Sequence, residues 1–304
     1  MEEAARSIAS IRTLIAEKQS GEGEIRSDIL VGLVGRSIQS SRSPAMHERE
    51  AARLGLRSTY ILIDFDKLQL ADDDLSACIA AARELGFNGL NVTHPFKQQV
   101  VTCLDELSAE ATAIGAVNTV VFANDKAVGH NTDCWGFAES FRREMAGVAL
   151  DRVVQFGAGG AGAAVAYALM ELGVRDLAIV DPVPGRAQDL AGRMMAATAG
   201  AIRAVEELAP AIAAADGLVN TTPVGMAKYP GIPFPVDLLK PRHWVAEIVY
   251  FPSETELLRH ARGIGCKTSS GMGMAVGQAV RAFELFTGQA ADMGAMAGHF
   301  EAAA

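Results

Sequence analysis

The sequence predicts an α/β protein, and three observations lead to this class. The length of 304 residues suits one large domain or two ordinary ones and can bury a sizeable core. Half of the residues are hydrophobic and 30 are glycine, which is typical of chains with many tight turns between strands and helices. Short apolar runs alternate with helical patterns along most of the chain. This alternation predicts mainly parallel sheets that are covered by helices on both faces.

The first half of the chain is expected to form one domain, at residues 29–133, behind an N-terminal extension at 1–28. The extension is charged and amphipathic, and we expect a loosely attached helix without a function there. A helix at 43–54 is expected to start with Ser43 as its N-cap and Pro44 in its first turn. The other expected elements are strands at 29–34, 59–63 and 89–92, helices at 75–85, 98–104 and 109–113, and a β-rich piece at 117–128.

A second domain is expected at residues 134–273. The elements of its most regular part are helix 135–145, strand 153–156, helix 161–172, strand 177–180 and helix 186–197. Later strands are expected at 218–220 and 245–249. Helices at 274–287 and 290–303 close the chain, and we expect residues 274–304 to complete the first domain.

Charge and cysteine content narrow the function classes. The formal net charge of −9 argues against nucleic acid and anionic membranes as partners. Four scattered cysteines without a CxxC pair predict reduced thiols and no metal site. The N-terminus is acidic, unlike that of a signal peptide. The apolar stretch 153–170 contains Gln155 and four glycines, so we expect a strand, a turn and a helix there instead of a membrane span. We therefore expect a cytoplasmic protein.

A glycine-rich turn follows the strand at 153–156 directly and opens the next helix. Its residues fit the pattern G-x-G-x-x-G and are Gly157, Ala158, Gly159, Gly160, Ala161 and Gly162. Small residues in this context let the backbone approach a pyrophosphate, whose charge then meets the amides of the helix N-terminus. The turn predicts a dinucleotide site. The alternatives are a flavin, another nucleotide or close helix packing.

The residue that ends the next strand bears on the choice of dinucleotide. Asp181 lies about 20 residues beyond the turn, where a carboxylate can bind the adenine ribose hydroxyls and would repel a 2′-phosphate. This favours NAD over NADP. Arg186 points the other way, because it could reach a phosphate. A further alternative is that Asp181 only caps the turn at 182–185.

Polar residues gather after the strands of the first half. Ser41 and Ser43 precede a helix N-terminus, which suits a carboxylate, although plain capping is the alternative. Thr93 and Lys97 follow a buried strand, where open α/β sheets bind ligands; a solvated surface lysine is the alternative for Lys97. Further amides, hydroxyls and a carboxylate occur at 115–119 and 129–133, where they could also serve turns, and we assign His130 no catalytic role.

These segments together resemble the shikimate/quinate dehydrogenase family, in order and over nearly the whole stretch 29–288. The matching residues are Ser41-Arg42-Ser43-Pro44, Asn91-Val92-Thr93-His94-Pro95-Phe96-Lys97, Gly115–Thr119, Asn131-Thr132-Asp133, the glycine turn, Asn220–Met226, Tyr250-Phe251-Pro252 with Thr255, and Met274 with Gln278. The resemblance implies a substrate domain, a Rossmann-like cofactor domain and a cleft between them. It implies an enzyme that moves a hydride between a nicotinamide cofactor and shikimate or quinate, without a metal.

The resemblance also implies roles for individual residues. Lys97 and Asp133 would form the catalytic proton-transfer pair. Ser41 and Ser43 would hold the substrate carboxylate. The residues implied to hold the ring hydroxyls are Thr93, Asn118, Asp133 and Gln278, with Tyr250 near the substrate. The residues implied to contact the cofactor, beyond the glycine turn, Asp181 and Arg186, are Thr222, Ile248 and Gly271.

Several departures from the family pattern bear on specificity. The turn at 181–186 lacks the Asn-Arg-Thr-type sequence of NADP-using members and resembles the NAD-using quinate/shikimate branch. Glu247 stands where aspartate is more typical, and Ser270 precedes Gly271 where an Asp-Gly pair is more usual. Ser43 favours shikimate, since threonine there is more typical of quinate-preferring enzymes.

Other functions remain alternatives at this point. They are an NADP-dependent biosynthetic shikimate dehydrogenase, a non-catalytic quinate- or shikimate-sensing regulatory protein, and a dehydrogenase acting on a folate or an amino-sugar-derived ring. Lys97, Asp133 and the intact glycine turn argue against the regulatory protein. A monomer or a homodimer is expected.

Overall fold

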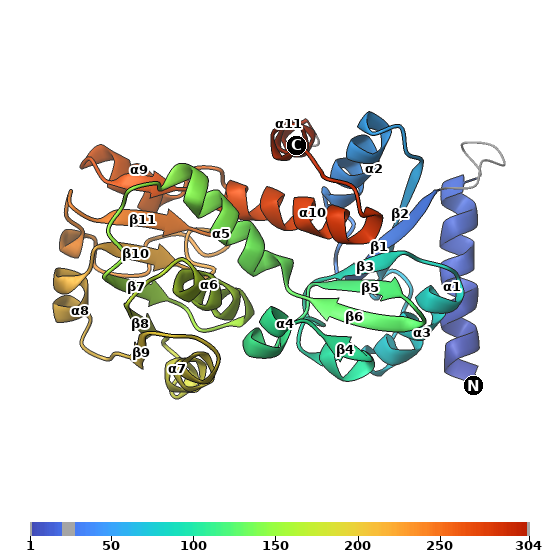
Figure 1. Cartoon of the computed structure of the whole chain (residues 1–304), viewed down its shortest axis with the longest axis horizontal. Helices are drawn as coiled ribbons and strands as arrows, with labels where there is room; N and C mark the ends of the chain where they lie inside the picture. The colour runs from blue at the N-terminus through green and yellow to red at the C-terminus, as the bar shows by residue number, and fades with distance from the viewer. Residues whose placement is uncertain (1, 20–27, 303–304) are drawn as a thin grey trace. The chain divides into compact units, whose positions relative to one another are not determined.

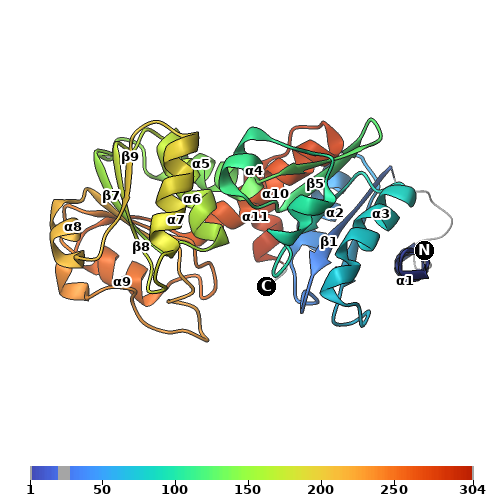
Figure 2. The same cartoon turned by 90° about the horizontal axis from the view of Figure 1, so that it is seen from below.

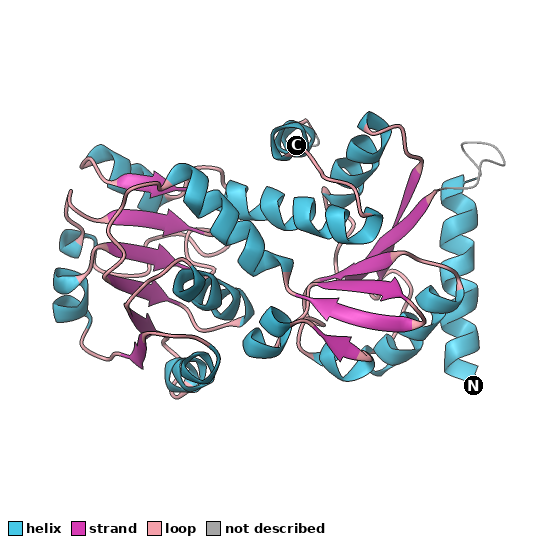
Figure 3. Ribbon diagram, viewed as in Figure 1, coloured by secondary structure: helices cyan, strands magenta, loops and turns pink. Residues whose placement is uncertain are grey.

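The computed structural model describes residues 2–19 and 28–302 (Figure 1). The described chain divides into two compact units. The first takes in the residues up to Thr132 and again those from Ala279 onward, and the second is Asp133–Gln278. Each unit contains a sheet of its own with helices packed against it (Figure 3).

The sheet of the first unit has six strands in the order β2-β1-β3-β5-β6-β4. They are β1 (Ile29–Gly35), β2 (Ser58–Asp64), β3 (Gly89–Val92), β4 (Glu106–Leu107), β5 (Thr119–Ala123) and β6 (Lys126–His130). β1 pairs in parallel with β2 and with β3, whereas β5 runs antiparallel to β3 and to β6. The α/β class with mostly parallel sheets is thus confirmed, and β5 is the reversed strand of this sheet.

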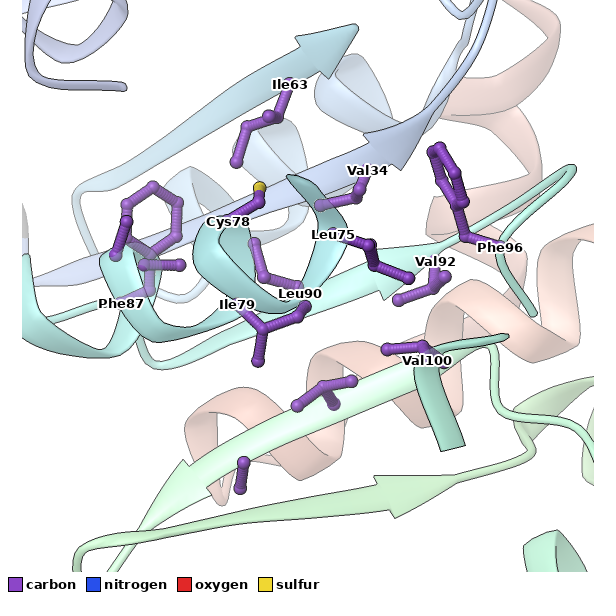
Figure 4. Close-up of a cluster of buried hydrophobic side chains, with 14 of the residues drawn as sticks. Val34, Ile63, Leu75, Cys78, Ile79, Phe87, Leu90, Val92, Phe96 and Val100 are labelled. Atoms are coloured by element: carbon purple, nitrogen blue, oxygen red, sulfur yellow. The ribbon is translucent and has the colours of Figure 1, made fainter. Parts of the chain in front are cut away.

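Helices cover both faces of this sheet. The helices of this unit are α1 (Glu2–Gln19), α2 (Ser43–Arg53), α3 (Leu75–Glu84), α4 (Ala109–Ile114), the second half of α10 (Gly271–Thr287) and α11 (Met293–Glu301), the last of which packs on α2. Because side chains alternate along a strand, Val34 of β1 lies in a buried cluster with Leu75 and Cys78 of α3 (Figure 4). Val31 lies in the opposite cluster with Phe286 of α10. The two clusters hold the strand ends firmly in place.

Three details differ from the expectations. The N-terminal helix is not loosely attached: Ile11 of α1 is 1% exposed and belongs to the core cluster that contains α3 (Figure 1). The sequence shows an apolar stripe on this helix, but it does not show which surface of the protein the stripe packs against. Ser43 is not the N-cap of α2 but its first helical residue, and Arg42 takes the cap position without a capping hydrogen bond from its side chain. The segment expected as a helix at 98–104 is a 3-10 turn at Gln99–Cys103.

The sheet of the second unit is entirely parallel, in the order β12-β11-β10-β7-β8-β9. Its strands are β7 (Arg152–Phe156), β8 (Asp176–Val180), β9 (Ala201–Ala204), β10 (Gly217–Asn220), β11 (Trp244–Glu247) and β12 (Lys267–Ser269). Counted along the chain from β7, this order is 3-2-1-4-5-6, which is that of doubly wound dinucleotide-binding folds. In such sheets the ligand lies beyond the carboxyl ends of the strands, where the order reverses between β7 and β10.

The helices of this unit follow from its topology. They are α5 (Thr132–Glu144), α6 (Gly160–Glu171), α7 (Arg186–Ala197), α8 (Leu208–Ala214), α9 (Glu256–Gly263) and the first half of α10. Right-handed crossovers place α6 and α7 on one face of the sheet and α8 and α9 on the other (Figure 2). No helix in the described ranges is long and apolar enough to cross a membrane.

Candidate active site

The polar residues of the first unit emerge at one edge of its sheet. The carboxyl ends of β1 and β3 lie at this edge because the two strands are parallel. β5 is reversed, so that it begins there, and β6 ends there. The edge therefore carries the loops that contain Ser41 and Ser43, Thr93 and Lys97, Asn118, and the residues up to Thr132.

Backbone contacts lock these loops against one another. The Thr93 amide donates to the Val34 carbonyl at 3.0 Å, and the Val117 amide donates to the Lys97 carbonyl at 2.7 Å. A Cβ atom on Gly35 would lie 2.5 Å from Thr93 Cγ2, so only glycine leaves room for that threonine. Lys97 is half-buried. The hydrogen bond with the Val117 amide holds the backbone of Lys97 between the end of β3 and the start of β5.

A buried carboxylate organises the loop that leads to Ser41 and Ser43. Asp64, at the end of β2, accepts hydrogen bonds from the amides of Ser37, Ile38 and Asp66 and from the Gln39 side chain, at 2.9–3.1 Å. Burial alone would raise the pKa of Asp64, but these hydrogen bonds outweigh it and lower the pKa. Ser37 takes a left-handed backbone conformation, with φ of 54°. The loop conformation thus depends on this carboxylate.

A chain of buried polar side chains runs beneath the same edge. The Tyr60 hydroxyl donates to Asn91 Oδ1 at 2.9 Å, and Asn91 Nδ2 donates to Thr119 Oγ1 at 3.2 Å. Asn118 Oδ1 then accepts from the Thr132 amide at 2.7 Å. Sequence reasoning gave no role to Tyr60 or Thr132. The signal for Tyr60 was a tyrosine hydroxyl within an expected strand of a sheet that helices cover on both faces.

This series of hydrogen bonds ends at Thr132, the first residue of α5, and Asp133 follows it in the sequence. Asp133 is 8% exposed. Helix α5 packs closely on α10: a Cβ atom on Gly136 would lie 2.5 Å from the backbone nitrogen of Gln278. The structure therefore brings the helices of Asp133 and Gln278 together within the second unit. The side-chain Nε2 of Gln278 donates to the Ala275 carbonyl at 3.0 Å. Tyr250 lies in the loop after β11 and is 48% exposed.

The glycine turn of the second unit follows β7 as expected, and its glycines serve two purposes. Gly157 has a φ of 102°, and a Cβ atom on Gly162 would lie 2.4 Å from the Gly157 carbonyl oxygen. Internal packing therefore requires both residues to be glycine. By contrast, a Cβ atom on Gly159 or Gly160 would meet nothing within 4 Å. These two positions leave open space at the N-terminus of α6, as a site for a phosphate group requires.

Two side chains for which we predicted no role, Gln155 and Thr221, hold this turn. Gln155 of β7 is fully buried, and its Nε2 donates to the carbonyls of Gly157 and Gly162, each at 2.9 Å. The Thr221 hydroxyl, which follows β10, also donates to the Gly157 carbonyl at 2.9 Å. A glutamine in an otherwise apolar strand was the available signal for Gln155.

We expect Gly162→Ala to destabilise the fold by about 1–3 kcal/mol, because the new methyl group overlaps backbone atoms that cannot move aside. Urea denaturation measures this change. The matched control is Gly192→Ala in α7, where a Cβ atom meets nothing within 4 Å. This control should be neutral or slightly stabilising, by up to about 1 kcal/mol, since alanine favours helix. Equal stabilities of the two variants would contradict the packing argument.

Asp181 binds the backbone of two turns, the glycine turn at Ala158 and the turn at 182–185 at Val183. Its two carboxylate oxygens accept hydrogen bonds from the Ala158 amide at 2.8 Å and the Val183 amide at 2.9 Å. The capping role that we kept as an alternative is therefore present. Each oxygen retains a further lone pair, so that a ribose hydroxyl can still donate to it. Arg186 is the exposed first residue of α7.

The other expected cofactor contacts lie at the carboxyl ends of β10, β11 and β12. The Thr222 hydroxyl donates to Asn220 Oδ1 at 2.7 Å. Gly271 packs on the Ile248 backbone, since a Cβ atom on it would lie 2.2 Å from the Ile248 carbonyl oxygen. The whole edge, with its open turn and its acidic residue after β8, fits a dinucleotide. Throughout the two described ranges, no group of three or more His, Cys, Asp or Glu side chains could hold a metal ion.

The fold and the site define an α/β protein with a dinucleotide-binding unit and a second unit that gathers polar groups at one sheet edge. Comparisons with known proteins narrow this class. Residues 33–120 match the family described as the shikimate dehydrogenase substrate binding domain. A shikimate dehydrogenase (NADP(+)) from Streptomyces avermitilis is 54% identical, over 86% of this chain and 91% of its own length. A quinate/shikimate dehydrogenase (NAD(+)) from Corynebacterium glutamicum is 48% identical, over 88% and 96%.

A solved structure is also similar to this chain. Quinate dehydrogenase from Corynebacterium glutamicum in complex with NAD aligns with a TM-score of 0.88 at 46% identity, over 91% of this chain and 100% of that one. The chain therefore belongs to the shikimate/quinate dehydrogenase family, whose members named here use NAD or NADP.

Proposed function

We propose that this chain interconverts shikimate and 3-dehydroshikimate, and also quinate and 3-dehydroquinate, with NAD as the favoured cofactor. The observation that carries the proposal is the convergence of Ser41, Ser43, Thr93, Lys97 and Asn118 at one sheet edge. Hydroxyls at a helix N-terminus suit a carboxylate, and the amide and hydroxyl groups suit ring hydroxyls. A small polyhydroxylated acid matches this set. We also propose a monomer or a homodimer, which light scattering of the purified chain would distinguish.

Each side chain has a defined part in the proposed reaction. Ser41 and Ser43 bind the carboxylate, while the side chains that hold the ring hydroxyls are Thr93, Asn118, Asp133 and Gln278, with Tyr250 beside the ring. Lys97 Nζ takes the proton from the reacting hydroxyl, and the Asp133 carboxylate balances the charge that the lysine gains. A nicotinamide dinucleotide, when bound, supplies the hydride chemistry. Loss of a hydride from carbon and of a proton from oxygen leaves the ketone.

The proposed dinucleotide contacts are the residues of the second sheet edge. The amides of the turn Gly157–Gly162 (with Ala158, Gly159, Gly160 and Ala161) would hold the pyrophosphate. Thr222, Ile248 and Gly271 would also contact the cofactor. Asp181 would accept from the ribose hydroxyls, and its charge disfavours a 2′-phosphate. The similarity to the NADP-using Streptomyces enzyme supports a second candidate, an NADP-dependent shikimate dehydrogenase, in which Arg186 outweighs Asp181.

The test is a set of four assays that combine shikimate or quinate with NAD or NADP and follow the absorbance of the reduced nicotinamide. The expected result is a higher kcat/KM with NAD than with NADP, and with shikimate than with quinate. Turnover with NADP and shikimate alone would establish the second candidate instead. Folded protein that is silent in all four assays would overturn the proposal and favour a ligand-sensing protein or another ring substrate.

We expect Asp181→Ala to lower kcat/KM for NAD about tenfold more than for NADP, because only NAD offers two free ribose hydroxyls to the carboxylate. Both values should fall, since the Ala158 and Val183 amides lose their acceptor. The ratio of the two kcat/KM values is therefore the measurement. Arg186→Ala is the matched control and should lower NADP turnover alone. An unchanged ratio in Asp181→Ala would remove the argument for NAD.

A further inference from the structure

A buried carboxylate links three segments at the cofactor edge of the second unit. Glu247 is the last residue of β11 and is 2% exposed. Its Oε1 accepts hydrogen bonds from Asn220 Nδ2 at 2.9 Å and from the Val249 amide at 3.0 Å. Its Oε2 accepts from the Thr255 hydroxyl at 3.2 Å. Glu247 thus joins the end of β10, the loop after β11 and the start of α9.

The same contacts reach residues that we assign to the dinucleotide. Asn220 Oδ1 accepts from the Thr222 amide at 3.0 Å and from its hydroxyl at 2.7 Å, while Asn220 Nδ2 also donates to the Val224 carbonyl at 2.8 Å. Ile248 lies between Glu247 and Val249 in the chain. The carboxylate therefore holds Thr222 through Asn220, and it holds Ile248 through the backbone on either side.

Among the residues that the structure describes, the partners of Glu247 are all neutral. The groups that face it are Asn220 from β10, the amides of Ile248 and Val249 from the next loop, and Thr255 from α9; none of them titrates. Glu254, which directly precedes Thr255 in the chain, pairs with Arg262 at 2.7 Å. Burial without a cation raises the pKa of Glu247 to about 7. This carboxyl therefore changes its charge within the physiological pH range.

Protonation would disturb the arrangement because every neighbour donates. An ionised carboxylate accepts all of these hydrogen bonds, whereas a protonated one presents an O–H group to a shell of donors. Among its side-chain and amide partners, the Thr255 hydroxyl is the group that can turn to accept. Thr255 Oγ1 also accepts from the Leu258 amide at 3.3 Å as the N-cap of α9, and if it accepted from the protonated carboxyl as well, it would give up the hydrogen bond that it donates to Oε2. The contacts to Asn220 and Val249 would weaken.

We propose that Glu247 is a positioning residue that holds Thr222 and Ile248 for the dinucleotide only while it is ionised, so that dinucleotide affinity falls as the carboxyl takes up a proton. This rests on the proposed function, in that these two residues contact the cofactor. Binding and deprotonation of Glu247 are then linked, and binding near neutral pH releases protons.

The experiment is the dissociation constant of NADH, and in parallel of NADPH, measured by fluorescence from about pH 5.5 to about pH 9 without a second substrate. For the natural chain, we expect about tenfold weaker binding at the acid end, with a midpoint near the pKa of Glu247. Glu247→Gln should show a flat profile at the weak, acid-end affinity, because it mimics the protonated form. Glu247→Asp retains a titrating carboxylate and should keep a pH step. A purely structural role would lower affinity equally at every pH.

A second readout measures the release of protons directly. Calorimetry of NADH binding near pH 7, in two buffers of different ionisation enthalpy, should show release of about half a proton by the natural chain. Glu247→Gln should release none. A flat profile in the natural chain, or the same pH step in Glu247→Gln, would overturn this proposal alone. Binding of neither dinucleotide at any pH would overturn the cofactor assignment as well, whereas binding without shikimate or quinate turnover would overturn only the substrate assignment.

Discussion

Replacing Lys97 with alanine is expected to lower kcat for shikimate oxidation by about 10²–10⁴-fold, the usual contribution of a positioned proton-transfer group. The Lys97 carbonyl is fixed by the Val117 amide at 2.7 Å, so the amine is presented from a backbone that cannot drift. The substitution removes the proton acceptor and leaves the second unit untouched. NADH affinity should therefore remain within about twofold of the natural value.

A lysine elsewhere in the same unit provides the control. Lys126 of β6 forms an exposed ion pair with Glu106, and its side chain is 53% exposed. Lys126→Ala should retain full kcat, since exposed pairs contribute little. Steady-state kinetics on both variants, together with NADH binding, tests the assignment. If Lys97→Ala turned over at the natural rate, the proposed proton-transfer role of Lys97 would be wrong.

The second large effect is expected at Asp64. Asp64→Ala removes the common acceptor of three amides and one side-chain amide, and we expect the free energy of unfolding to fall by about 3 kcal/mol. The loop to Ser41 and Ser43 loses its anchor at the same time, so the KM for shikimate should rise more than kcat falls. Thermal or urea unfolding and steady-state kinetics measure the two effects.

Lowering the pH should destabilise the fold in the same way as Asp64→Ala, because it protonates the Asp64 carboxylate. Because the pKa of Asp64 in the folded chain lies below its ordinary value of 3.8, its contribution is present above that value and is lost as pH falls through the folded-state pKa. Asp66→Ala is the control: this neighbouring carboxylate pairs with Arg36 at 2.6 Å but is 48% exposed. Its removal should cost much less stability. Equal losses for the two variants would show that burial of Asp64 does not matter.

Much of the fold and of the site could be predicted from the sequence, for local reasons. The glycine turn lies where the pattern placed it, and α7 spans Arg186–Ala197 as expected, because capping glycines and periodic apolar residues act over a few positions. The expected site segments at Ser41, Thr93 and Asn118 do follow or precede strands that share an edge. The short elements β9, β12, α8 and α9 were missed, since each spans only three to eight residues, too few for a periodic pattern to show, and depends on the sheet beside it.

The sequence by itself therefore determined the α/β class, the dinucleotide turn and the residue types that a hydroxylated acid requires. The tertiary structure alone decided which side chains hold those groups in place. Asp64 meets a loop 25 to 27 residues away, Gln155 grips both ends of the turn, and Glu247 reaches Asn220 from 27 residues along the chain. Such contacts depend on strand order and on burial, which set the distance between groups and the cost of leaving them unpaired. Neither quantity is encoded in any short stretch of residues.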